Sequence, residues 1–346
     1  MSIHNKYMER CIELAYLGLG STYPNPMVGS IIVHNNEIIG EGWHDKAGNP
    51  HAEVNAINSV ENQKLLKEAT IYVSLEPCSH YGKTPPCSDL IIAKGIKKVV
   101  VGTIDPHNKV AGKGIQKLIN AGCEVIIGVK EEECKTLNKR FFTYHKRNRP
   151  YIILKWAESN DGFIAPQEKD ERKPVWISNL YSRQLTHKWR TEEQSILVGN
   201  NTVIADNPSL TSRDWQGNNP LRIIIAPNGK TPESSNIFNE DANTIVYTKN
   251  DTSSIDKSTE IISLDDDSDV AIQVTQSLYK KGIQSVIVEG GLYTINHFIK
   301  NNLWDEARIF IGTTEFVSGT KAPEIKGKII QEKQVLTDKL RILVND

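Results

Sequence analysis

The sequence predicts an α/β protein built from two domains. The chain has 346 residues, more than the roughly 100 to 200 residues typical of one domain. In both halves, short apolar runs typical of strands alternate with segments of helical periodicity. The run "KRNRP" near 147–150 precedes an extended segment and marks a boundary. We therefore expect domains at 1–147 and 148–346.

The first domain is predicted to be a layered α/β unit. The segment "VGSIIVHNNEIIGEGW" predicts a hairpin, because Asn35 and Asn36 tolerate the left-handed backbone of a tight turn. Further strands are expected in "TIYVSLE", "KKVVVGT" and "EVIIGV". Helices are expected over 4–20, 52–67 and 88–94, the last ending at Gly95, and over "EEECKTLNKRFFTYHKRN".

The second domain is predicted to hold a largely parallel sheet covered on both faces. Its expected strands are "YIILKWA", "SILVG", "LRIIIAP", "NTIVYT", "EIISL", "SVIVEGG" and "ARIFIG". Its expected helices lie near 179–192, 269–281 and 293–301. The acidic run "DDDSD" at 265–269 is interpreted as the solvated start of the second of these helices.

Composition excludes several function classes. A formal net charge of -1, with "KRNR" at 146–149 as the main basic cluster, offers little attraction for nucleic acid. The amino terminus lacks the apolar core of a signal peptide and no run approaches 18 apolar residues, so we predict a cytoplasmic protein without a membrane partner. The five cysteines are an odd number in a long chain, which predicts reduced thiols, with Cys11, Cys123 and Cys134 in the core.

Four residues in the first domain predict a catalytic zinc site. Such a site takes three protein ligands and leaves one position for water, and His51, Cys78 and Cys87 supply a recognised set. Glu53 follows His51 by two residues and could move a proton between the activated water and a leaving amine. The cysteines flank a strand-to-helix turn, where exposed N–H groups favour thiolate. Since side chains two apart in a helix diverge by about 200°, His51 must lie at or before the first turn.

Other interpretations of these residues stay open at this point. A structural zinc site takes four protein ligands, and His44, His80 and His107 are candidates for the fourth. An incidental pair of cysteines is the remaining alternative. Nucleobase deaminases carry H-x-E followed by P-C-x-x-C. Here the second element is P-C-x8-C, with the insert "SHYGKTPP".

Four stretches resemble the deaminase half of the bifunctional riboflavin-biosynthesis deaminase/reductase. They are the insert itself, "YPNPMVGSIIV", "GEGWHDKAGNPHAE" and "DPHNKVAGKG". The resemblance implies a cytidine-deaminase-like zinc domain. It assigns four residues to the pocket of a pyrimidine ribotide substrate: Asn25, His44, His80 and Lys83. Lys83 suits a phosphate by its charge. One departure is "DPHN" at 105–108, where the family usually has "DPNP" and His107 replaces Asn.

In the second domain, glycine turns are the first sign of a cofactor. The G-x-G-x-x-G fingerprint after a strand is missing. "VIVEGG" nevertheless places two glycines between a buried strand and a helix, where N–H groups can hold a phosphate, and Gly199 follows "SILV" in the same way. Each turn alone is weak, because glycine after a strand is usually only turn chemistry.

Five motifs resemble, in this order, the reductase half of the same family. They are "LKWAESNDGFIA", "WISN", "HKWR", "ILVGNNTVIADNPSLTSR" and "VIVEGG". The resemblance implies a dihydrofolate-reductase-like α/β fold and NADPH as hydride donor. It assigns the sugar-phosphate substrate to Lys155, Ser178, Arg190, Leu210, Arg213 and Glu289, with Asp206 as a catalytic group. It assigns the cofactor to Gly199, Thr202, Gly290 and Gly291. As alternatives, Asp206-Asn207-Pro208 could be only a turn and Lys155 only an exposed strand residue.

The resemblance predicts zinc-dependent deamination of 2,5-diamino-6-ribosylamino-4(3H)-pyrimidinone 5′-phosphate, followed by NADPH-dependent reduction of the ribosyl to a ribityl group, in a homo-oligomer. Two departures in the reductase half bear on this prediction: Gln194 replaces the family's Asp, and residues 312–323 lack its usual pattern. An active deaminase with an impaired reductase is therefore one alternative. A nucleic-acid editing deaminase and a non-enzymatic regulator with a structural zinc ion are the others.

Overall fold

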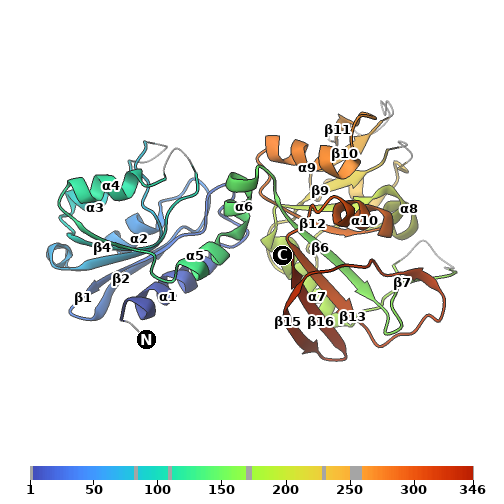
Figure 1. Ribbon diagram of the computed structural model, residues 1–346, viewed down its shortest axis with the longest axis horizontal. Helices are drawn as coiled ribbons and strands as arrows, with labels where there is room; N and C mark the ends of the chain where they lie inside the picture. Colours follow the sequence, from blue (N-terminus) through green and yellow to red (C-terminus); the bar gives the residue numbers. More distant parts are fainter. Residues whose placement is uncertain are drawn as a thin grey trace. The chain divides into compact units, whose positions relative to one another are not determined.

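Figure 1 shows the computed structural model of the chain, which describes residues 3–81, 85–107, 111–168, 174–227, 231–249 and 259–345. The chain divides into two compact units, Met1–Asn148 (unit 1) and Arg149–Asp346 (unit 2), and each is described by itself. Within the described residues, none of the helices combines the length and the apolar character that crossing a membrane requires.

Unit 1 is built on a sheet of five strands, counted over the described residues, in the order β2-β1-β3-β4-β5. The strands are β1 (Gly29–His34), β2 (Glu37–Trp43), β3 (Thr70–Leu75), β4 (Lys98–Thr103) and β5 (Glu124–Ile127). The predicted hairpin is confirmed: β1 and β2 pair antiparallel, and Asn35 and Asn36 have φ of 50° and 65°. Because β1 is also antiparallel to β3, strands β2, β3 and β4 all end at the same edge of the sheet.

Helices cover both faces of this sheet (Figure 1). They are α1 (Ile3–Tyr16), α2 (Ala52–Asn58), the 3-10 helix η1 (Gln63–Lys67), α3 (Cys87–Ala93), α4 (Lys113–Asn120), α5 (Glu131–Leu137) and α6 (Lys139–Arg147). One core layer joins α2, α3 and α4 to the sheet and includes Ile57, Ile91 and Leu118. The other joins α1 and α5 to it and includes Met8 and Cys134.

Three predicted helices of unit 1 are shorter than expected, and the first of them, predicted over 4–20, ends at Tyr16. The helix predicted over 52–67 ends at Asn58, and η1 begins a new turn because the Asn62 side chain accepts from the Lys64 N–H. The predicted closing helix is divided at Asn138 into α5 and α6. The Asn138 amide bonds both the N–H and the carbonyl oxygen of Met27, which holds this residue out of the helical conformation. Helix α4 was not predicted.

Unit 2 is built on a sheet of nine strands, counted over the described residues, in the order β11-β10-β9-β8-β12-β6-β13-β16-β15. The seven predicted strands are confirmed as β6 (Tyr151–Glu158), β8 (Ser195–Gly199), β9 (Leu221–Ile225), β10 (Thr244–Thr248), β11 (Thr259–Ser263), β12 (Ser285–Gly290) and β13 (Glu306–Ile311). They run parallel, while β15 (Lys328–Val335) and β16 (Asp338–Val344) add an antiparallel edge. A separate pair joins β7 (Phe163–Pro166) to β14 (Gly319–Lys321).

Helices lie on both faces of this sheet, as predicted. They are α7 (Leu180–Glu192), α8 (Asn200–Asp206), the 3-10 helix η2 (Asn236–Phe238), α9 (Val270–Lys280) and α10 (Leu292–Lys300). One core layer includes Val274 and Phe298 from α9 and α10. On the opposite face, Trp189 of α7 packs against the sheet in one cluster and Val203 of α8 in another. The acidic run does start α9, since Asp269 accepts from the Ala271 N–H at its amino end.

Candidate functional site

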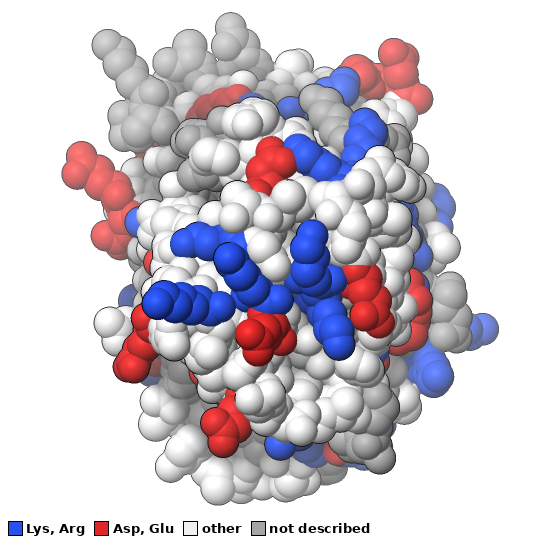
Figure 2. Space-filling model, turned by 90° about the vertical axis from the view of Figure 1, so that its left-hand side faces the viewer, with Lys and Arg blue, Asp and Glu red and all other residues white. Residues whose placement is uncertain are grey.

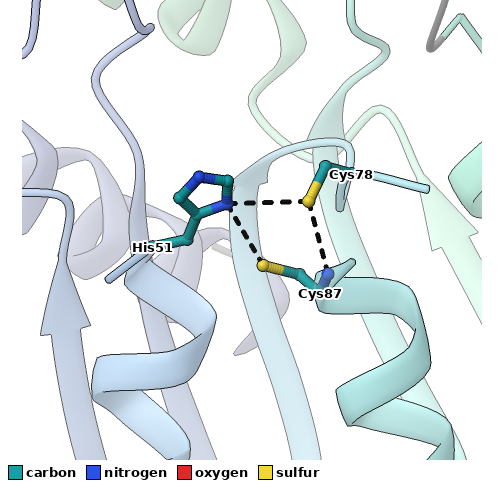
Figure 3. A group of neighbouring side chains, drawn as sticks. All are labelled: His51, Cys78 and Cys87. Atoms are coloured by element: carbon teal, nitrogen blue, oxygen red, sulfur yellow. Dashed lines mark hydrogen bonds between the residues drawn. The ribbon is translucent and has the colours of Figure 1, made fainter. Parts of the chain in front are cut away.

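His51, Cys78 and Cys87 form one compact group at the edge of unit 1 where β2 and β3 end (Figure 3). The Nδ1 atom of His51 lies 3.6 Å from the Cys78 sulfur and 3.3 Å from the Cys87 sulfur. In a tetrahedral site with bonds of about 2.0 to 2.3 Å, a nitrogen and a sulfur ligand are about 3.5 Å apart. The three donor atoms are therefore spaced as ligands of one zinc ion.

The local sequence explains how these side chains meet. His51 precedes α2 with an extended backbone, φ −72° and ψ 162°, as the divergence of residues two apart in a helix predicted. Cys87 is the first residue of α3, and its N–H donates to the Cys78 sulfur over 3.3 Å. Hydrogen bonding with Cys87 and with His51 lowers the pKa of the Cys78 thiol to about 4. Cys78 thus favours thiolate, the form that binds zinc, whereas the hydrogen bond with Cys78 raises the pKa of the Cys87 thiol.

A fourth protein ligand does not join this group within the described part of the chain. His44, one candidate, is held elsewhere: its Nδ1 lies 3.1 Å from the Pro50 carbonyl oxygen and its Nε2 lies 3.0 Å from the Asn25 amide nitrogen. Three protein ligands are the arrangement of a catalytic rather than a structural zinc site.

Glu53 lies in the first turn of α2 with 3% of its surface exposed. Burial raises the pKa of its carboxyl group to about 7, and the nearby Cys78 sulfur adds to this effect. Glu53 also interacts with the Cys87 thiol. A carboxyl group with a pKa near neutrality, beside the metal-binding group, can both accept and donate a proton.

The predicted pocket residues of unit 1 have different surroundings. His44 is buried, and its ring lies edge-on to that of His51, with centroids 5.5 Å apart. The Asn25 amide adjoins the same ring. His80 is exposed. Burial raises the pKa of the Asp105 carboxyl group, and the charge of His80 acts in the opposite direction. Lys83 lies outside the described residues.

In unit 2, three predicted substrate residues, all half-buried, form a network of charges. Glu289, near the end of β12, accepts from Arg190 at 3.0 Å and 2.7 Å, and the third guanidinium nitrogen donates to the Thr211 carbonyl oxygen. Burial alone would raise the pKa of Glu289, but Arg190 and then Lys155 outweigh it and lower the pKa to about 2. Lys155 extends from the neighbouring strand β6 and is not an exposed strand residue.

The remaining predicted substrate residues lie near helix ends. Ser178 precedes α7, Asp206 is the last residue of α8 and half-buried, and Leu210 is buried with a left-handed φ of 55°. Arg213 is exposed, and the charge of Arg190 acts on it. Two cations close enough to repel each other are typical of an anion site.

Sequence reasoning missed the residues that surround Arg213. Asp214 accepts from Arg183 Nε at 2.6 Å, and its N–H donates to the Nδ1 atom of buried His187 at 3.4 Å. Burial and then Arg190 lower the pKa of His187 to about 4. These contacts join α7 to the 211–215 loop, and a pattern within one segment could not have revealed them.

The four predicted cofactor residues lie together at the edge where the neighbouring strands β8 and β12 end. A Cβ atom on Gly290 or Gly291 would lie 3.3 or 3.2 Å from the Thr202 hydroxyl, and one on Gly199 would overlap Thr294 at 2.4 Å. The glycines thus keep side chains out of a cradle between the starts of α8 and α10. Such a cradle fits a phosphate group of a nucleotide.

The residues that depart from the family pattern are all accommodated. The Gln194 side chain accepts from the Gln284 N–H at 2.8 Å. This bond lies at the start of β8, whereas Gly199 lies at the end of the same strand. The 312–323 segment is tied to the β6–β7 turn, because Asp161 accepts from the N–H groups of Phe316 and Val317. The His107 ring adjoins that of His145, with centroids 4.7 Å apart.

One face of unit 1 carries a group of basic side chains with acidic ones among them (Figure 2). Basic residues of η1 and of the α3–β4 connection lie close together in this unit: Lys94 donates to the Gln63 side chain, and Lys67 lies against Gly95. A surface of mixed charge attracts a polyanion weakly.

All five cysteines are free, as predicted. Cys11, Cys123 and Cys134 are buried core residues, which confirms the second part of that prediction.

Comparisons with known proteins agree across both units. Residues 1–103 match the cytidine and deoxycytidylate deaminase zinc-binding region, and residues 150–325 match the RibD C-terminal domain. The riboflavin biosynthesis protein RibD of Aquifex aeolicus is 41% identical over 95% of this chain and 92% of its own. That of Escherichia coli is 35% identical over 88% and 86%.

Solved structures give the same result. A diaminohydroxyphosphoribosylaminopyrimidine deaminase/5-amino-6-(5-phosphoribosylamino)uracil reductase from Thermotoga maritima has a TM-score of 0.91, 38% identity and 99% coverage of both chains. RibD of Acinetobacter baumannii has a TM-score of 0.90 and 32% identity, also over 99% of both chains. Unit 1 contains a His/Cys/Cys group that could hold a zinc ion, and unit 2 matches the RibD C-terminal domain. The chain belongs to the RibD family of bifunctional deaminases/reductases of riboflavin biosynthesis.

Proposed function

We propose that unit 1 hydrolytically deaminates 2,5-diamino-6-ribosylamino-4(3H)-pyrimidinone 5′-phosphate and that unit 2 then reduces the product with NADPH to 5-amino-6-(5-phosphoribitylamino)uracil. The observation that carries the proposal is the three-ligand group of His51, Cys78 and Cys87 beside buried Glu53. It occurs in a chain that aligns over 99% of its length with the Thermotoga maritima deaminase/reductase. The proposed domain boundaries are 1–147 for the deaminase and 148–346 for the reductase.

In unit 1, we assign the metal to His51, Cys78 and Cys87. Bound zinc would supply Lewis-acid activation of water. Glu53 would take a proton from that water and deliver it to the departing amine, and its burial keeps bulk water away from this exchange. The distances of 3.3 and 3.6 Å between donor atoms support the assignment.

The substrate site of unit 1 is proposed to contain Asn25, His44, His80 and Lys83. The hydrogen bond between the His44 ring and the Asn25 amide fixes both groups beside His51, where a pyrimidine ring would face the metal. If His44 Nδ1 donates to the Pro50 carbonyl oxygen, its Nε2 accepts from Asn25 and the amide oxygen of Asn25 is left to bind an exocyclic amine. Lys83 is proposed to bind the phosphate by charge.

In unit 2, we propose that Arg213 and Arg190 bind the substrate phosphate. Arg190 uses three of its five N–H groups on Glu289 and Thr211, which leaves two for an anion. Lys155 and Asp206 would hold or protonate the sugar, and Glu289, Ser178 and Leu210 would complete the site. Lys155 is half-buried and within the electrostatic influence of Glu289, which supports a role beyond solubility.

We assign the nucleotide cofactor to Gly199, Thr202, Gly290 and Gly291. Bound NADPH would supply the hydride. The position of Thr202 supports this assignment, because a side chain on Gly290 or Gly291 would press against its hydroxyl and fill the space beside the backbone. That the enzyme is a homo-oligomer remains a prediction.

A two-step assay tests the proposal. Purified zinc-loaded protein should release ammonia from the diaminopyrimidinone ribotide without NADPH, and should oxidise NADPH only after deamination has occurred. Ammonia release without later NADPH oxidation would limit the proposal to unit 1. Absence of ammonia release would contradict the assignment of the metal site.

A further inference from the structure

A second carboxylate of unit 1, Glu76, lies directly after β3 and two residues before Cys78. It is 4% exposed and both of its oxygens accept backbone hydrogen bonds. Oε2 accepts from the N–H groups of Asp105 at 3.2 Å and Gly112 at 2.9 Å. Oε1 accepts from those of Gly114 at 2.9 Å and Ile115 at 3.4 Å. One side chain thus joins the loops after β3 and β4 to the start of α4.

Further contacts fix the backbone on the amino side of Cys78. The Glu76 N–H donates to the Thr103 carbonyl oxygen at 2.9 Å, which extends the pairing of β3 with β4. A Cβ atom on Gly114 would lie 1.9 Å from the Pro77 carbonyl oxygen, so α4 packs directly against the peptide that leads to Cys78. The Glu76 carboxylate thus holds the start of α4 in place, and α4 in turn packs against Pro77.

The carboxyl side of Cys78 is held by α3. The Ser88 N–H donates to the Cys78 carbonyl oxygen at 3.1 Å, and the Cys87 N–H donates to its sulfur at 3.3 Å. Cys78 is therefore fixed between two anchors, Glu76 on one side and the start of α3 on the other. Loss of the Glu76 side chain would weaken the anchor on the amino side and leave the Cys78 sulfur less firmly positioned.

The bonding pattern requires a carboxylate. Four N–H donors converge on two oxygens, and the partial positive charge at the start of α4 favours an anion there. Glutamine would retain one oxygen and turn an NH₂ group toward the remaining donors. We expect glutamine to preserve the size of the side chain but only part of the anchor.

We propose that Glu76 is a positioning residue that sets the affinity of the metal site by fixing Cys78 relative to His51 and Cys87. The inference rests on the proposed assignment of these three residues as zinc ligands. Groups that orient a metal ligand typically change metal affinity by about 10- to 100-fold when they are removed. Glu76 itself need not touch the metal or the substrate.

The test compares the full-length protein with the variants Glu76→Ala, Glu76→Gln and Leu118→Ala. Leu118 is fully buried on α4, so its truncation weakens the same helix without touching the Glu76 bonds. Zinc affinity is measured by competition with a chromophoric chelator. Cobalt(II) is bound in place of zinc, and its thiolate charge-transfer and ligand-field bands report how the sulfurs are arranged.

We expect Glu76→Ala to bind zinc about 10- to 100-fold more weakly and to alter the cobalt spectrum, with a smaller loss in Glu76→Gln. Leu118→Ala should lower the unfolding midpoint while its zinc affinity and cobalt spectrum stay those of the unchanged protein. If Glu76→Ala does not fold, Glu76→Gln decides the question by the same two measurements.

Three results would overturn the inference. Glu76 variants with unchanged zinc affinity and cobalt spectrum would make Glu76 an ordinary fold residue, and so would a Leu118→Ala variant that loses affinity equally. Both results leave the zinc assignment standing. An unchanged protein that shows no thiolate-to-cobalt band would contradict the zinc assignment itself, and the inference would fail with it.

Discussion

At the scale of single residues, chemistry that depends on nearby positions was visible in the sequence, whereas chemistry that depends on distant partners was not. The spacing of His51 and Glu53 predicted that the histidine must precede the first helical turn, and it does. By contrast, Arg190 and Glu289 pair although 99 positions separate them. A pattern within one segment contains no information about such a pair.

Glu53→Gln tests the proposed proton transfer. The variant should keep its zinc, because the three proposed ligands are unchanged, and should lose deamination by about 100- to 10,000-fold because an amide cannot move the proton. Metal content and ammonia release measure the two effects. Glu37→Gln, at the exposed turn of the β1–β2 hairpin, is the matched control. Near-normal turnover in Glu53→Gln would remove Glu53 from the reaction.

Asp206→Asn tests the proposed catalytic group of unit 2. Ammonia release should be unchanged, while NADPH oxidation should fall on the order of 100-fold, since a positioned acid typically contributes that much. Asp267→Asn, an exposed acid of the same unit, should affect neither rate. Equal losses of both activities in Asp206→Asn would instead indicate a structural role at the α8 turn.

At the scale of elements, the patterns predicted most strands and misplaced several helix ends. Apolar strands such as β8 and β12 are continuous in the sequence and were recognised. The division between α5 and α6 was missed because it depends on Asn138 bonding to Met27, which lies 111 positions away. Strand β15 was missed because its side chains are mostly exposed and show no apolar alternation.

The stability of unit 2 should depend on pH, because His187 of α7 binds protons differently in the folded and unfolded chain. Its folded pKa of about 4 lies below the ordinary value of about 6.5, so between these values the unfolded chain binds a proton that the folded chain does not. The free energy of unfolding should therefore be highest above pH 6.5 and fall as the pH approaches 4.

Denaturant unfolding followed by tryptophan fluorescence measures this slope, because five of the six tryptophans lie in unit 2. His187→Gln should flatten the slope between pH 6.5 and 4 by up to one proton. Lys188→Gln, a partly exposed neighbour on α7, should leave it unchanged. An identical slope in His187→Gln and in the unchanged protein would exclude His187 as its source.

At the scale of the whole molecule, each unit has its own sheet, its own cores and its own candidate site. The sequence predicted this organisation because motifs of the two halves follow each other without mixing. The observed division, after Asn148, lies one residue beyond the expected boundary. Periodicity could not establish how Glu76 joins three segments of unit 1, since those bonds depend on the closed fold.

Removal of the metal should separate the two activities. The metal-binding group belongs to unit 1 and the glycine cradle to unit 2, so a chelator should abolish ammonia release but leave NADPH-dependent reduction of the deaminated intermediate within about twofold. Added zinc should restore deamination. Parallel loss of reduction would show that unit 2 also depends on the metal.

The most direct test of the central claim is mass spectrometry of the diaminopyrimidinone ribotide after incubation with the zinc-loaded protein, without and with NADPH. We predict that one amine is replaced by oxygen in both reactions, and that two hydrogens are gained only with NADPH. A product that stays at the deaminated stage despite NADPH would contradict the reductase assignment. A substrate that is unchanged in both reactions would contradict the proposed function as a whole.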